Sequence, residues 1–390
     1  MSGNLVRNRF AAVAVKIEST QGVDSIAGSP VAADFILGDC QVRFNPQQVQ
    51  DPSFSGTLDV LPPVAGSFRP TLELRVPLRG SGTAGTAPSW GALMRACAME
   101  ELTDAIGIAA TAASSGTATT ATLPVAFSST AQRYRGLPLI LTGNPTGPYI
   151  APCIDYTAGR VATFGETFSP VLSASTLVAV PAHVMYRPTS DESVYRTVTV
   201  YLWRDGYRWR FVGGVGTVRL ELETGGMGTL VFSLMAQVLD QAANANPAAA
   251  LVSGAAPSPP IFQNGRCRLF GDKAQANRLA FDLGVTNALP EDPEAINGVG
   301  PGVPMMRAST LDIDPLIDTT IQANLFARLT SGASGAAFAV LGTTAGNRFS
   351  AVMPAARTLS NDPGDRNGFG ANSIRAQANS PDSGLIICQF

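Results

Sequence analysis

The segment 195–239 constrains the fold more than any other part of the chain, because apolar and polar residues alternate through it almost without interruption. Asp205-Gly206 supplies a hairpin signal, and the glycines at 213–214 and within 225–228 mark two further turns. The pattern predicts an antiparallel meander of four strands. It holds no nucleophile–base pair, metal-ligand cluster or phosphate loop, so it favours a protein that assembles over one that catalyses.

Composition supports an assembling protein. The 390 residues suffice for two or three domains, and 45% of them are apolar, as in a globular chain. Charged residues make up only 14%, which predicts that copies of the chain or partners cover much of its surface. The alternative is a chain that is merely rich in Ala and Gly. A net charge of −2 provides no basic field for holding nucleic acid.

The five cysteines are scattered singly, without a CxxC pair, which predicts reduced and mostly buried thiols instead of disulfides or zinc sites. The opening MSGNLVRNRF lacks the apolar core of a signal peptide. No apolar run reaches the length of about 18 residues that a membrane helix needs. We therefore expect synthesis in the cytoplasm, no classical export leader and no membrane span.

The chain divides into three regions. Residues 1–104 and 188–245 form one discontinuous domain, which opens with an extended arm and includes the clean alternation of 71–78 and a proline-rich loop at 45–69. Residues 105–187 form a small inserted all-β module, in which a linker-like run at 105–122 precedes short strands. Those strands are predicted at 137–142, 149–156, 160–164 and 176–180. A second linker at 240–260 leads into the domain 246–390.

The best helix signal follows Pro88-Ser89. Its apolar face comprises Trp90, Leu93, Met94 and Cys97 at helical spacing. Such a stripe predicts a helix packed across a sheet, and it favours that interpretation strongly over a cofactor site.

The domain 246–390 resembles the first in its order of elements. Strands are predicted at 310–315 and 320–329, followed by a Gly/Ser turn and a short helix at 333–341. This order matches residues 71–99 followed by the meander, and it indicates a duplicated fold. Similar propensities arising by chance are the alternative.

No pattern in the chain supports catalysis. His183 is the only histidine, and no GxSxG nucleophile elbow occurs. The acidic segment 311–318 lacks the glycine and terminal glutamate of a calcium loop. The aromatic and basic residues of 203–210 are expected at a subunit contact, since no wider basic field accompanies them. The sequence predicts no enzyme, no cofactor and no metal site.

Several segments together resemble the major tail tube proteins of long-tailed, siphovirus-type phages. These segments are Lys16–Gly22, Gly82–Gly91 with Leu93–Cys97, the hairpins of 201–234, Leu341–Phe349 and the hydrophobic C-terminal strand. The resemblance covers residues 1–104 and 190–390. Residues 105–187 depart from it and are similar to small β-modules grafted into phage structural proteins. This similarity predicts a module that decorates the tube exterior.

The resemblance implies a mainly β fold, a β-sandwich or barrel module with one packed helix, duplicated in this chain. Rings of such modules close a continuous inner β-barrel and stack into the hollow tail tube that conducts DNA from capsid to host cell. It implies self-contacts within and between rings, other tail proteins such as the tape measure and the tail terminator as partners, and a place in the virion tail. The arm and the loop 45–69 suit contacts between rings.

Electrostatics then suggests the residues that line the channel, because a DNA conduit has to leave the polymer free to slide. The candidate lumen-facing residues are Glu73, Glu221, Glu223, Asp312 and Asp314. The alternative is that these carboxylates face solvent or pair with Arg75 and Arg219 across strands.

The copy number per ring depends on the duplication. Rings of this family have sixfold or sixfold-like symmetry, so two tube modules per chain favour a trimeric, pseudo-hexameric ring. If the second domain is an outer decoration, six chains are needed. The remaining alternatives are another virion structural or decoration protein and a surface adhesin built of sandwich domains.

Overall fold

The computed structural model describes residues 7, 9–44, 46–143, 148–247 and 257–390. Most of the predicted N-terminal arm and the middle of the linker at 240–260 lie outside these residues. The described part is mainly β, as the alternating patterns predict, and it contains two α-helices.

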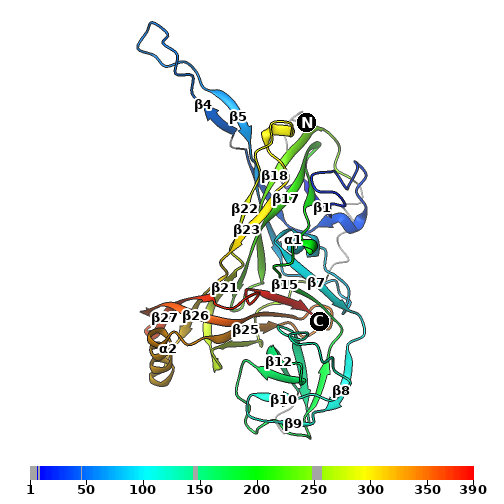
Figure 1. Cartoon of the computed structure of the whole chain (residues 1–390), viewed down its shortest axis with the longest axis vertical. Helices are drawn as coiled ribbons and strands as arrows, with labels where there is room; N and C mark the ends of the chain where they lie inside the picture. Colours follow the sequence, from blue (N-terminus) through cyan, green and yellow to red (C-terminus); the bar gives the residue numbers. More distant parts are fainter. Residues whose placement is uncertain (1–6, 8, 45, 144–147, 248–256) are drawn as a thin grey trace.

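One continuous sheet of seventeen strands organises the molecule (Figure 1). Fourteen of its strands form two groups of seven, which we call the first and second repeats. The first repeat consists of β1 (Ala11–Ile17), β2 (Phe35–Ile36), β3 (Asp39–Arg43), β6 (Thr71–Pro77), β16 (Val198–Arg204), β17 (Tyr207–Glu223) and β18 (Thr229–Ala243). The second consists of β19 (Arg266–Leu269), β20 (Asp272–Lys273), β21 (Gln275–Asp282), β24 (Thr310–Leu316), β25 (Gly335–Leu341), β26 (Phe349–Arg366) and β27 (Phe369–Ala378). The other three strands are β7 (Met99–Asp104), β15 (His183–Pro188) and β28 (Ile386–Gln389).

The two repeats have the same order of hydrogen-bonded strands. In the first repeat it is β2–β1–β16–β17–β18–β6–β3. In the second it is β20–β19–β25–β26–β27–β24–β21. Because both the chain order and the pairing order agree, the predicted duplication is confirmed at the level of the fold.

The repeats are joined edge to edge within the chain. The far half of β17 pairs with β21 from Arg219 to Glu223, beyond the half that pairs with β16. This junction gives a run of eight strands, β3–β6–β18–β17–β21–β24–β27–β26, which we call the wall. One face of the wall is apolar and contributes to the largest buried core of the described residues.

A middle sheet covers that apolar face. It contains β7, β15, β28, β25 and the first half of β26. Along β25, Ala337 and Ala339 face the wall, whereas Phe338 and Val340 face the opposite way. Both faces of β25 are buried, which explains why this strand reads as a continuous apolar run without alternation.

The inserted module packs on the far side of the middle sheet. It is a seven-stranded sheet. Its strands are β8 (Ile108–Ala112), β9 (Ser115–Gly116), β10 (Thr120–Thr122), β11 (Pro138–Thr142), β12 (Tyr149–Tyr156), β13 (Val161–Phe164) and β14 (Leu177–Val180). Its core is continuous with Phe338, Val352 and Ile386 of the middle sheet. The inserted module is thus a third layer, which shares a hydrophobic core with the middle sheet.

The prediction of a linker at 105–122 was wrong, because this run forms β8, β9 and β10. Its small residues permit close packing. A side chain at Gly116 would come within 2.6 Å of the Leu172 backbone, and Ala121 is fully buried. Composition alone does not separate such a strand-forming run from a linker.

Two neighbouring predictions between β24 and β26 are wrong, because the helix and the strand were assigned in the reverse order. The segment predicted as a strand is the helix α2 (Thr319–Ser331), and the segment predicted as a helix is β25. Asp318 begins α2 by accepting hydrogen bonds from the amides of Thr320 and Ile321. Gly332 ends it in a left-handed conformation with φ +67°. The apolar run of β25 has no helical period because both of its faces are buried.

The meander has three strands, not the four that were predicted. Gly213-Gly214 does not turn the chain, since β17 continues through it with a shift in its register to β18 between Val212 and Val215. The Gly213 backbone has φ +64°, as expected for a glycine at a bulge.

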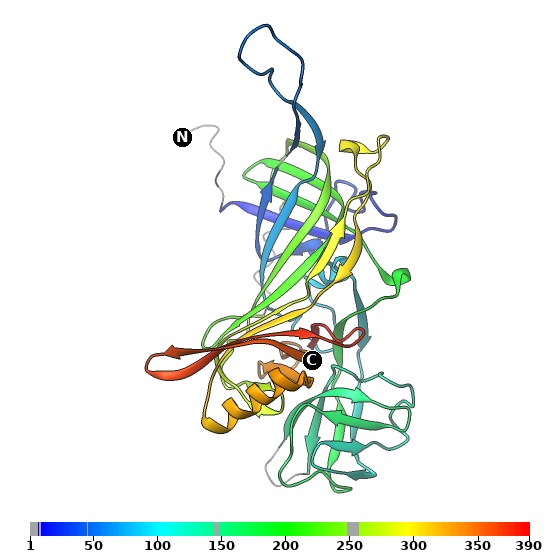
Figure 2. The ribbon, with the colours of Figure 1, turned by 60° about the vertical axis from the view of Figure 1, so that its left-hand side comes forward.

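Each repeat also carries a two-stranded hairpin between equivalent strands. The first is formed by β4 (Pro46–Val49) and β5 (Val64–Phe68), between β3 and β6. The second is formed by β22 (Val285–Ala288) and β23 (Val303–Arg307), between β21 and β24. Figure 2 shows the first hairpin projecting from one end of the molecule, whereas the second runs alongside β17 and β18.

Candidate functional site: the charged face of the wall

The wall has a polar face opposite its core. Along β6, Leu72, Leu74 and Val76 are buried, so the alternation turns the intervening residues to the other side. Neighbouring strands continue this face in register. One such row consists of Asp39, Arg75, Val231, Arg219, Asp282, Thr310, Gln377 and Arg357.

Arg219 stands at the centre of this face. Its guanidinium lies 3.3 Å from the Glu221 carboxylate and 3.7 Å from that of Asp312. Arg278 approaches Glu221 at 3.6 Å, and Arg375 approaches Asp312 at 3.8 Å. Acidic and basic groups therefore alternate across β17, β21, β24 and β27. Each such partly exposed pair contributes about 1 kcal/mol or less, so the pattern balances charge more than it stabilises the fold.

The other predicted carboxylates lie on the same face at different places. Glu73 pairs with Arg75 along β6 at 2.9 Å. Asp314 pairs with Arg366 at 2.9 Å and also accepts hydrogen bonds from two backbone amides of β21. Glu223 is exposed at the end of β17. The five carboxylates thus share one face, and Arg219 bridges two of them.

Sequence reasoning missed the arginines that complete this face. It weighed Arg75 and Arg219 as partners, and both do form ion pairs with the predicted carboxylates. It did not identify Arg278 or Arg375. Alternation along 369–378 was the available signal for Arg375, whereas the register shift between Ala276 and Leu279 obscures that signal at Arg278.

The helix α1 (Gly91–Ala96) lies behind the wall. Trp90, Leu93, Met94 and Cys97 are all fully buried. Trp90 precedes the helix as its N-cap residue, and its indole donates a hydrogen bond to the Arg79 carbonyl at 2.8 Å. These side chains fill the space between the wall and the middle sheet, where they support the face without reaching it.

The bulge in β17 is held by a buried carboxylate. Glu18 is 4% exposed and accepts a hydrogen bond from the Gly213 amide at 2.8 Å. It also accepts from the hydroxyls of Thr197 and Thr199 and from the Gly22 amide. Four donors on one buried carboxylate fix both the bulge and the loop that follows β1.

The aromatic residues of β16 are packed inside the chain. Trp203 and Tyr201 are 1% and 0% exposed, and the arginines at 208 and 210 lie over the Tyr201 ring at 5.5 and 5.7 Å. The predicted cation–π packing is therefore present. Trp203 is covered within the single chain, whereas Tyr207 and Trp209 are half-buried, so the expected subunit contact of 203–210 stays a prediction.

Within the described ranges, no three His, Cys, Asp or Glu side chains gather in a way that would hold a metal ion. All five cysteines are free thiols, and burial raises the pKa of Cys40 and Cys153 to about 12. Burial also lowers the pKa of His183, whose Nδ1 lies 2.9 Å from the Pro181 carbonyl oxygen. No helix that the structure describes is long and apolar enough to cross a membrane.

The wall has two outer edges. Among the described residues β3 pairs only with β6, and the far half of β26 pairs only with β27. An open strand edge is a template for pairing with another chain. In a single chain, the eight-stranded wall therefore has two outer edges, formed by β3 and by the far half of β26, at which strands of other chains can pair.

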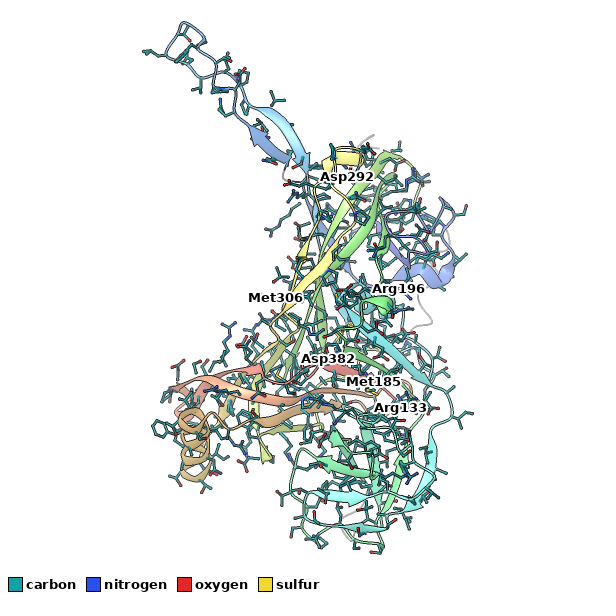
Figure 3. All side chains as sticks on the ribbon, viewed as in Figure 1. Arg133, Met185, Arg196, Asp292, Met306 and Asp382 are labelled. Atoms are coloured by element: carbon teal, nitrogen blue, oxygen red, sulfur yellow. The ribbon has the colours of Figure 1, made fainter. Side chains whose placement is uncertain are left out.

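The β4–β5 hairpin exposes apolar side chains at its tip. Phe54 and Leu58 are fully exposed, at 103% and 105%, and Val60 is 83% exposed. Figure 3 shows side chains of this hairpin standing clear of the rest of the molecule, whereas Met306 of β23 lies along its body. Exposed apolar side chains gathered on a projection indicate a contact surface.

Comparison with known proteins agrees with this architecture. The family model of the phage tail tube protein matches residues 11–378. The chain belongs to the phage tail tube protein family. No significant match was found among curated proteins.

A phage tail tube protein is a structural component of the virion tail, and its family is not one of enzymes. Such proteins act by assembling with copies of themselves and with other tail proteins. The candidate functional surfaces of this tail tube protein are its wall, the outer edges of that wall and its hairpin tip.

Proposed function

We propose that this tail tube protein polymerises as stacked rings into the hollow tube that conducts DNA from the capsid to the host cell. The observation that carries the proposal is the wall, whose apolar face is covered, whose polar face is exposed, and whose two outer edges have no further strand partner among the described residues. Edge-to-edge pairing around a ring removes those edges and gives a closed barrel.

The repeat sets the number of chains. Each chain supplies eight wall strands in two equivalent groups of four. Three chains then close a barrel of twenty-four strands with pseudo-sixfold symmetry. Six chains per ring would instead require one repeat of each chain to lie outside the barrel, which the β17–β21 junction argues against.

The polar face then lines the channel. The middle sheet and the insertion cover the opposite face, so a ring with the polar face inward carries both of them on its outside. Glu73, Glu221, Glu223, Asp312 and Asp314 line the lumen together with their arginine partners. Balanced charge offers a phosphate backbone no continuous basic track, so DNA slides past.

The hairpin tip and the insertion have separate roles in this proposal. The tip around Phe54 and Leu58 contacts the next ring and buries its exposed apolar groups there. The inserted module decorates the exterior. The tape measure protein occupies the lumen during assembly, and the terminator caps the finished tube in the virion.

Electron microscopy of the purified chain tests the function. We expect hollow filaments, and averaged end-on views are expected to show three insertions per ring. Six insertions per ring would contradict the trimer. A chain that remains monomeric at all concentrations would contradict polymerisation itself.

A further inference from the structure

The junction between the two repeats is a template for the junction between chains. Within the chain, Arg219 of β17 lies opposite Asp282 of β21, and Glu223 lies opposite Arg278. Opposite charges that face each other across antiparallel strands stabilise one register over its neighbours. The same kind of edge occurs once more, at the outer side of the second repeat.

The β3 and β21 strands occupy equivalent places. Thr71 on β6 lies opposite Arg43 on β3, and Thr310 on β24 lies opposite Asp282 on β21. Both threonines are followed by leucine and then by a carboxylate on the wall face. Arg43 therefore has the position in the first repeat that Asp282 has in the second.

Equivalent positions on the long strands β17 and β26 are found by following the strand pairings outward from Glu73 in the first repeat and from Asp312 in the second. From Glu73 the ladder crosses β18 to Thr217, and from Asp312 it crosses β27 to Ser360. Two residues further along each strand lies a charged residue. The resulting equivalent positions are Thr217 with Ser360, Arg219 with Asp362, Glu221 with Gly364, and Glu223 with Arg366.

Transferring the template to a second copy gives charge-matched pairs. Asp362 of one chain falls opposite Arg43 of the next, and Arg366 falls opposite Asp39. Each pair has opposite charges, with the signs reversed relative to the pairs inside the chain. Asp39, Arg43 and Asp362 are exposed in the single chain. The matching used the Thr-Leu-carboxylate pattern of β6 and β24 and the backbone register, and it did not use the charges of the four residues that are paired here.

We propose that residues 362–366 of β26 pair antiparallel with residues 39–43 of β3 in a second copy of this chain, in the register that sets Asp362 opposite Arg43. The inference rests on the proposed ring assembly and specifies its contact. Charge reversal also selects the partner, because Asp362 would face a like charge if β26 met the Asp282 edge of β21 in the equivalent register.

Local features of both edges fit this pairing. Pro363 falls opposite Val42 and donates no ladder hydrogen bond to any strand that pairs at this edge, so the flanking charges carry more of the selection of the partner. Arg366 is held by Asp314, so its backbone is positioned before a partner arrives. On the other edge, Arg204 donates a hydrogen bond to the Cys40 carbonyl at 2.8 Å and anchors β3.

The charge test uses Arg43→Asp, Asp362→Arg and the double variant. Each single variant places like charges opposite each other, and we expect the concentration for half-maximal filament formation to rise about tenfold. The double variant restores opposite charges and is expected to return close to the original concentration. Arg133→Asp, an exposed reversal on the insertion, is the matched control and is expected to change little.

A crosslinking test fixes the register. Gln41 and Gly364 fall opposite each other, at a separation that a disulfide can span. With cysteine at both positions, oxidised filaments are expected to yield covalent chains of three, whereas Gln41→Cys combined with Ser360→Cys is expected not to. The native Cys40 thiol is buried, and its raised pKa keeps it unreactive.

The outcomes separate the two proposals. Two outcomes would overturn the register while leaving the tube function intact. One is filaments that form without the crosslink. The other is a charge-swapped double variant that needs as high a concentration for filament formation as the single variants. Failure of the unmodified chain to form filaments would overturn the tube function as well.

Discussion

The β4–β5 and β22–β23 hairpins occupy the same position in the two repeats, yet they differ in what they contact. The first exposes Phe54 and Leu58 at its tip. The second is anchored on β17, where the Gly302 amide donates to the Gly213 carbonyl at 3.1 Å and the Val285 amide donates to the Thr217 hydroxyl at 3.0 Å. The strands of the wall are thus duplicated in form, while the loops between them have diverged.

This difference bears on how rings stack. If both hairpins projected, a ring of three chains would present six equivalent contacts. With one hairpin folded back, the proposed ring presents three, and its barrel keeps a higher apparent symmetry than its stacking surface. The contrast between the hairpins, and between the helices beside them, can be tested by substitution.

The largest effect is expected from shortening the projecting hairpin. Replacing residues 52–61 by an Asn-Gly turn removes the apolar tip while leaving β4 and β5 intact. We expect single rings but no filaments in electron micrographs, with unchanged thermal unfolding of the chain. The matched replacement of residues 292–298 is expected to lower the unfolding temperature instead, because the adjoining Val299 is buried. Normal filaments from the first variant would remove the tip from the stacking contact.

The helices α1 and α2 also differ in how deeply their side chains are buried. Leu93 of α1 is fully buried, whereas Phe326 of α2 is 59% exposed. Leu93→Ala is expected to lower the free energy of unfolding by about 2–5 kcal/mol. Phe326→Ala is expected to cost less than about 1 kcal/mol, as for other surface positions. Urea unfolding of both variants measures the difference, and equal losses would show that α2 is as deeply packed as α1.

A smaller effect is expected at the folded-back hairpin. A Cβ at Gly302 would lie 2.1 Å from the Val215 side chain, whereas one at Gly300 would meet nothing closer than 3.7 Å. Gly302→Ala is expected to cost about 1–3 kcal/mol through overpacking against β17. Gly300→Ala serves as the control and should stay close to the original stability in the same urea titration. A neutral Gly302→Ala would indicate that the hairpin can lift from β17 at little cost.

The smallest effect concerns His183, which lies where the inserted module rejoins the middle sheet at the start of β15. Burial lowers its pKa in the folded chain below the unfolded value of about 6.5. Its contribution to stability is therefore present above that unfolded value and is lost as the pH falls through it towards the folded pKa. We expect His183→Gln to lose less stability than the original chain between pH 7 and pH 5. An identical pH dependence of the two unfolding free energies would contradict this.

Strands of the wall could be predicted from sequence where one of their faces is buried and the other is exposed to solvent. Thr71-Leu-Glu-Leu and Thr310-Leu-Asp-Ile show period-two alternation, so their strand identity and the facing of Glu73 and Asp312 were readable. The middle sheet could not be read in the same way, since residues 335–341 are apolar on both faces and carry no period. A helix and a doubly buried strand then look alike.

Pairing between distant segments was the other limit. The alternation around Arg219 shows which way its side chain points, but its closeness to Asp312 depends on the register of β21 between them. The continuous β17 was divided at Gly213-Gly214 because a bulge glycine and a turn glycine give the same local signal. Distant contacts distinguish the two, above all that of Glu18, which accepts a hydrogen bond from the Gly213 amide.

The place of β28 in the middle sheet has a consequence for how the chain folds. Its neighbours β15 and β26 both precede it in the chain, and its Ile386 and Ile387 belong to the cores on opposite sides. During synthesis, neither the inserted module nor the space behind the wall is sealed until these residues emerge from the ribosome. We therefore expect apolar surface of both cores to stay exposed in the nascent chain until β28 has been added.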